Sequence, residues 1–160
     1  MTKTEQLQQT WHNYDNREDD KPRSTREAVV WAVEEGILEL PRVDPFDVLA
    51  EQMAQALRAE MKTDSQGRRY RVNHAVRITK GGVQTTFWGA LGYAGPDHME
   101  RAFSQRREQI IGDCAQLKTD VDVYNDLVND KGIPTIQLVL DYTDDVAERE
   151  AARTLGKRAA

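Results

Sequence analysis

Arginine side chains recur at alternate positions in the middle of the chain. Arg69, Arg71 and Arg77 share one side of an alternating stretch, and Asn73 lies between them on that side. In an extended strand such side chains are about 7 Å apart, a spacing similar to that of phosphates along a nucleic acid strand. A guanidinium also binds phosphate through two parallel hydrogen bonds. The pattern predicts phosphate binding, with Asn73 able to reach a base edge.

Positive charge is concentrated around these arginines. Residues 57–80 carry a net charge of +5, whereas the whole chain carries −5 and residues 117–150 carry −6. Such asymmetry predicts the kind of partner and not the fold. The predicted nucleic-acid-binding residues are Arg58, Lys62, Arg68, Arg69, Arg71, Asn73, Arg77 and Lys80. Two other interpretations are open: the arginine face is neutralised by the acidic segments or left in solvent, or the hairpin docks an acidic protein partner.

The remaining reactive residues give no pattern typical of catalysis. No pair among the possible metal ligands has a zinc-site spacing, and Cys114 falls on an apolar stripe, where free cysteine commonly acts as a small hydrophobe. We assign Glu60 and Lys62, which match the E-x-K end of a nuclease signature, to surface charge at the end of a helix. We expect a non-enzymatic protein without catalytic residue, metal or cofactor. The possible metal ligands are His12, His74, His98 and Cys114.

His74 lies on the apolar side of the same alternating stretch, between Val72 and Val76. We expect a core histidine whose ring nitrogens bond neighbouring groups, and the alternative is a pH-sensitive joint.

Composition indicates a single-domain protein of the cytoplasm. The chain has 160 residues, of which 31% are charged and 39% hydrophobic, so apolar residues must be used as amphipathic stripes. One cysteine cannot form an internal disulfide, the N-terminus lacks the apolar segment of a signal peptide, and no apolar run approaches the ~18 residues of a membrane span. We therefore expect a cytoplasmic location and no membrane partner.

Helix signals dominate the N-terminal part. Ser24 and Glu27 form a capping box. Asp44 is placed to cap a further helix, and Pro45 suits its first position. The elements predicted before residue 63 are helices over 4–16, 25–35 and 45–62, a polar linker over 16–22 and a short strand over 37–40.

A β-hairpin is predicted around Gly81 and Gly82, which suit a two-residue turn with positive φ. If Lys80 opposes Val83, apolar residues of both strands fall on one face, so the turn and the pattern agree. The apolar positions of the first strand are Tyr70, Val72, His74, Val76 and Ile78, and the opposite face carries Arg69, Arg71, Asn73, Ala75, Arg77 and Thr79.

A long helix is predicted from Pro96 to about Asn129, followed by a strand over 136–140 and a final helix capped by Thr143 or Asp144. The apolar stripe of the long helix has the alternating spacing of four and three that is typical of coiled coils. We expect this stripe to form a homodimer. It consists of Ile110, Cys114, Leu117, Val121, Tyr124 and Val128.

The predicted fold is α+β and mainly helical, with three N-terminal helices, one basic hairpin, one long helix and a C-terminal strand and helix. Over about residues 4–88, this order of three helices and a hairpin resembles a winged-helix domain, in which the hairpin is the wing. We divide the chain into a helical region with its hairpin over 1–95 and a helical arm over 96–160, within one folding unit. The predicted function is a dimeric DNA-binding or transcription-regulating protein, and the alternative is a protein–protein adaptor.

Overall fold

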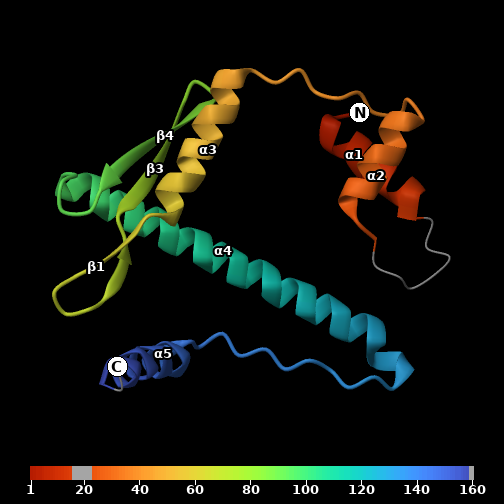
Figure 1. Cartoon of the computed structure of the whole chain (residues 1–160). Helices are drawn as coiled ribbons and strands as arrows, with labels where there is room; N and C mark the ends of the chain where they lie inside the picture. The colour runs from red at the N-terminus through yellow and green to blue at the C-terminus, as the bar shows by residue number, and fades with distance from the viewer. Residues whose placement is uncertain (16–22, 159–160) are drawn as a thin grey trace. The chain divides into compact units, whose positions relative to one another are not determined.

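The chain is α+β, as the sequence predicts, and a computed structural model describes residues 1–15 and 23–158 (Figure 1). Contacts divide it into two compact units, Met1–Gln55 and Ala56–Ala160. The expected boundary at residue 95 falls inside the second unit, which therefore holds both the basic hairpin and the long helix. The linker predicted over 16–22 lies outside the described residues.

The first unit contains two packed helices, α1 (Lys3–Asp15) and α2 (Thr25–Glu34). The Ser24–Glu27 capping box is present, which confirms that prediction. The strand predicted over 37–40 is wrong. Gly36 takes a left-handed conformation, with φ of 69°, and the backbone N–H groups of Ile37 and Leu38 turn back to donate to one carbonyl of α2. These groups satisfy the end of the helix and are not available to a sheet.

Helix α3 (Pro45–Ala59) begins as predicted, because the Asp44 carboxylate accepts a hydrogen bond of 2.9 Å from the backbone N–H of Phe46. The expectation that it continues to residue 62 is wrong. Residues Met61–Thr63 form strand β1, which pairs antiparallel with β2 (Arg69–Arg71) around a turn at Gly67. This hairpin was not predicted, and its cross-strand bonds compete with the last helical turn for the same backbone groups.

The second hairpin has the predicted register. Strands β3 (Asn73–Lys80) and β4 (Val83–Ala90) place Lys80 opposite Val83 and Val76 opposite Phe87. The alternation of faces is also confirmed, with Val72, His74 and Val76 buried. The expected single strand over 69–79 is divided between two hairpins at Val72, whose N–H donates to the Glu60 carbonyl and whose carbonyl accepts from Leu91.

The turn of this hairpin gives a first test of the fold. Gly81 and Gly82 have φ values of 55° and 78°, which strain residues with a Cβ atom. Gly81→Val is expected to lower the free energy of unfolding by about 1–2 kcal/mol. Gly81→Asn is the matched control and should be nearly neutral, since asparagine followed by glycine suits this turn. Urea denaturation followed by circular dichroism measures both. Equal losses for the two variants would contradict the turn geometry.

Helix α4 (Pro96–Val128) confirms the predicted long helix and extends about 50 Å. A short 3₁₀ turn, Asn129–Lys131, follows it and ends at Gly132. Strand β3 packs on the first part of α4 (Figure 1), where Ala102 is buried and the ring of Phe103 meets that of His74 edge-on at 5.0 Å. Buried residues of the second unit thus lie on both packed elements, with His74 and Val76 on β3 and Ala102 on α4.

The strand predicted over 136–140 is wrong. The side-chain amide of Asn125 on α4 binds both the N–H and the carbonyl of Ile136, at 2.8 and 2.9 Å, so a side chain takes the place of a neighbouring strand. The final helix, α5 (Thr143–Arg158), is present. Its first N–H, from Thr143, is capped by Asp141 and not by Thr143 or Asp144.

Candidate nucleic-acid interface

The arginine face of the β3–β4 hairpin is the floor of a groove of about 770 Å³. This volume lies within the range of about 300–1,000 Å³ typical of ligand pockets. Across the floor Arg77 pairs with Thr86 and Ala75 pairs with Trp88. Arg58, in the last turn of α3, and α4 residues around 104–109 complete the lining. The groove lies wholly within the second unit.

Four arginines line this groove: Arg58, Arg71, Arg77 and Arg106. Its only acidic lining residue, Glu108, accepts a hydrogen bond of 3.3 Å from Arg107. In the part of the chain that the structure describes, Arg71, Arg77 and Arg106 form no ion pair. Within the described residues, the acidic segment 117–150 therefore makes no ion pair with these three side chains, and the groove lining holds four arginines and one glutamate.

Hydrogen bonds hold the arginine-bearing backbone in place. The side-chain amide of Gln105 on α4 accepts from the N–H of Arg77 at 2.8 Å and donates to its carbonyl at 2.9 Å. The Nε2 of buried His74 donates to the carbonyl of Arg71 at 3.0 Å, and the Nε2 of His98 donates to the carbonyl of His74 at 2.9 Å. These bonds support the interpretation of His74 as a core histidine and fix the strand that carries the groove arginines.

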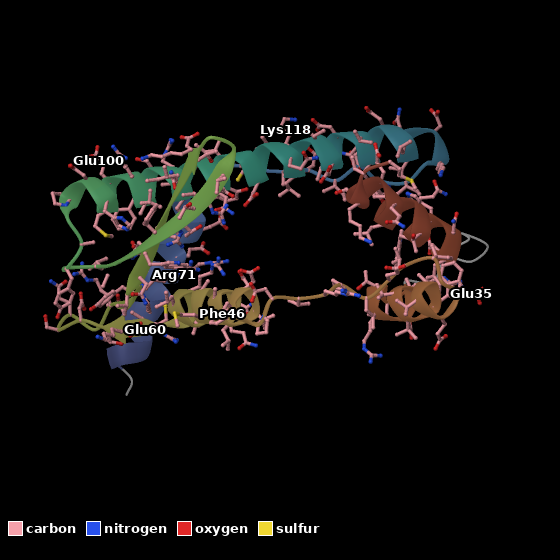
Figure 2. All side chains as sticks on the ribbon, turned by 90° about the horizontal axis from the view of Figure 1, so that it is seen from above. Glu35, Phe46, Glu60, Arg71, Glu100 and Lys118 are labelled. Carbon is pink, nitrogen blue, oxygen red and sulfur yellow. The ribbon has the colours of Figure 1, made fainter. Side chains whose placement is uncertain are left out.

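Other predicted binding residues are engaged within the chain. The Asn73 amide donates to the Glu60 carboxylate at 2.7 Å and to a carbonyl of α3 at 3.3 Å, so it ties α3 to β3 and does not extend toward a base. Figure 2 labels Glu60, which lies between α3 and β1, and Arg71, at the end of β2. Arg68 pairs with Asp64 at 2.7 Å. The backbone N–H and the guanidinium of Arg68 lower the pKa of the Asp64 carboxyl.

The remaining predicted residues lie outside the groove. Lys62 pairs with Tyr70 across the β1–β2 hairpin, so its side chain belongs to the face opposite the arginines. Glu60 directly follows α3, and its N–H still donates to the Ala56 carbonyl, so it lies at a helix end as expected. Lys62 lies instead within β1. Arg69 and Lys80 are exposed near strand ends and do not line the groove. Of the predicted set, Arg58, Arg71, Asn73 and Arg77 share this site.

The lining residues that were not predicted to bind include Trp88, Gln105 and Arg106. Trp88 was predictable, because the register that pairs Lys80 with Val83 also pairs Ala75 with Trp88 and so places the indole on the arginine face. No pattern in the sequence pointed to Gln105 or Arg106, since they reach the groove through the packing of α4 against β3.

Comparison of the chain with protein-family models, with curated proteins and with solved structures finds no match. The winged-helix resemblance thus remains a similarity in element order. Among residues 1–15 and 23–158, no cluster of His, Cys, Asp or Glu side chains is arranged to hold a metal ion. No helix in the same ranges combines the length and apolar character of a membrane span.

Proposed function

We propose that the second unit binds nucleic acid in the arginine-lined groove. The main support for this proposal is that Arg71, Arg77 and Arg106 line one groove and form no ion pair in the described part of the chain. Several guanidinium groups held close together favour the binding of a polyanion. Phosphate oxygens accept their hydrogen bonds, and the release of counterions from the nucleic acid adds to the binding free energy. In this proposal the three arginines position phosphates, whereas Arg68 and Asn73 maintain the local structure.

The proposal includes a homodimer formed through α4. Its interface uses fewer residues than the six of the stripe predicted from the sequence. Val128 is buried within one chain, and the Cys114 thiol lies 3.6 Å from the Tyr142 hydroxyl, so these two stripe residues are covered internally. Ile110, Leu117 and Tyr124, spaced seven residues apart, remain 42–51% exposed. A self-complementary pair of helices would cover this column and bring two basic grooves into one assembly.

Salt-dependent binding tests the groove. Replacing Arg71, Arg77 and Arg106 with alanine removes three phosphate contacts, and the slope of log affinity against log salt is expected to become shallower by about 2–3. Fluorescence anisotropy with labelled single-stranded and duplex oligonucleotides measures this slope. The control replaces Arg26, Arg42 and Arg149, three exposed arginines that remove the same charge elsewhere.

The control should leave the slope nearly unchanged. Equal effects of the two triple variants would show that only the net charge matters and would contradict a defined site. Failure of the wild-type chain to bind any nucleic acid at low salt would overturn the proposal. It would favour instead the docking of an acidic protein in the same groove.

A further inference from the structure

Trp88 is an aromatic residue on the polar face of the hairpin. Its neighbours on β4 on that face are Gln84 and Thr86, and it lies opposite the small side chain of Ala75. The buried residues of β3 lie on the other face, so the apolar core does not account for an indole at this position. Trp88 is half-buried and lines the arginine groove.

The indole has a planar partner in the free chain. The guanidinium of Arg58 lies 5.5 Å from the centroid of the Trp88 ring, a cation–π distance. Nucleic acid bases are also planar and stack on tryptophan rings and on arginine planes. The Arg58–Trp88 pair therefore presents the kind of surface that an unpaired base binds.

The arginines flank this surface along the strand. Arg77 is two residues from Ala75 on β3, about 7 Å away, and Arg71, the last residue of β2, lines the groove on the other side of Ala75 in sequence. Arg106 lines the same groove from α4. A nucleic acid strand that lies along the groove would thus contact an arginine, the Trp88 ring and a second arginine in turn. This order matches the alternation of phosphates and bases in an extended single strand.

We infer that the groove takes single-stranded nucleic acid, with a base stacked on Trp88 and its flanking phosphates bound by Arg71 and Arg77. This inference rests on the proposed function and specifies its ligand. In a duplex both faces of each base are already stacked, and exposing one costs a few kcal/mol. A single strand offers free base faces without that cost.

Fluorescence of Trp88 gives a direct test. The other two tryptophans, Trp11 and Trp31, lie in the first unit, so Trp11→Phe/Trp31→Phe leaves Trp88 as the only reporter. The full chain with these two changes is titrated with oligothymidylate, with an abasic strand of equal length and with a duplex. Oligothymidylate is expected to quench the emission and to bind most tightly. The abasic strand keeps the phosphates and should bind more weakly without quenching.

Substitutions of Trp88 separate stacking from charge. Trp88→Leu keeps an apolar side chain without a π face and is expected to weaken oligothymidylate binding about 5- to 150-fold. Trp88→Phe keeps an aromatic ring and should retain most of the affinity. The two variants should bind the abasic strand equally, and circular dichroism checks that both are folded. Equal oligothymidylate affinity of the two variants would overturn the inference.

The outcomes also distinguish this inference from the proposed function. Duplex binding that is as tight as single-strand binding, with no quenching by either, contradicts base stacking and leaves the nucleic acid groove standing. Equal affinity for oligothymidylate and for the abasic strand would likewise contradict base stacking and leave the nucleic acid groove standing. Absence of binding to all three probes at low salt overturns both.

Discussion

Leu117→Asp is expected to raise the dissociation constant of the proposed homodimer by about one to two orders of magnitude. Leu117 is 45% exposed in the single chain and occupies the middle of the column formed with Ile110 and Tyr124. Burying a fully exposed leucine is worth about 1.5–3 kcal/mol, so covering the exposed 45% of Leu117 is worth about 0.7–1.4 kcal/mol, and a two-fold pair loses about 1.4–2.7 kcal/mol. An aspartate there also places like charges opposite each other across the interface.

Val123→Asp is the matched control for the interface. Val123 lies on the same helix and is 51% exposed, but it is six residues from Leu117 and points about 120° away around the helix. Analytical ultracentrifugation of both variants should show a monomer only for Leu117→Asp. A wild-type chain that is monomeric at tens of micromolar would contradict the dimer, and a dimer that persists in Leu117→Asp would place the interface elsewhere.

Gly89→Ala is expected to destabilise the second unit by about 2–4 kcal/mol. A Cβ atom at Gly89 would lie 2.7 Å from the Cβ of Ala94 and 2.7 Å from two ring atoms of His98. Overpacking of this kind costs about 1–3 kcal/mol. Moving the His98 ring would also break its hydrogen bond to the carbonyl of His74, worth about 0.5–1.5 kcal/mol.

Gly112→Ala serves as the control in the same unit. Gly112 lies inside α4 with open space around its Cβ position, so alanine should stabilise the helix by up to about 1 kcal/mol. Thermal or urea unfolding of the two variants should therefore change in opposite directions. Unchanged stability of Gly89→Ala would show that the loop before α4 adjusts without cost and would contradict the close packing of α4 against β4.

Predictions based on local signals were mostly correct. The Ser24–Glu27 capping box, the Asp44 cap and the turn at Gly81 depend on groups only a few residues apart, so the sequence contains all the atoms involved. The register of β3 and β4 follows from that turn together with strict alternation of side chains. The long helix follows from a run between Pro96 and Gly132 that contains one glycine, Gly112, and no further proline.

The secondary structure of short segments was predicted less well, because groups elsewhere in the chain compete for their backbone hydrogen bonds. Residues 37–40 and 136–140 have the composition of strands, yet the end of α2 and the amide of Asn125 take their backbone hydrogen bonds. Residues 61 and 62 were assigned to a helix, but the pairing with β2 makes Met61–Thr63 a strand. In each case the deciding partner was not visible in the periodicity of the segment itself.

The sequence by itself determined the helices, the β3–β4 hairpin, the arginine face and the concentration of positive charge over residues 57–80. Only the tertiary structure decided which of these charges remain unpaired around one groove. Arg68 is bound to Asp64, Arg106 enters from α4, and Asn73 is held by Glu60 and the end of α3. Charge and alternation are properties of the chain read residue by residue, whereas a groove depends on which helix packs beside the strand. The amide of Gln105 on the backbone of Arg77 fixes that choice here through a contact twenty-eight residues apart in sequence.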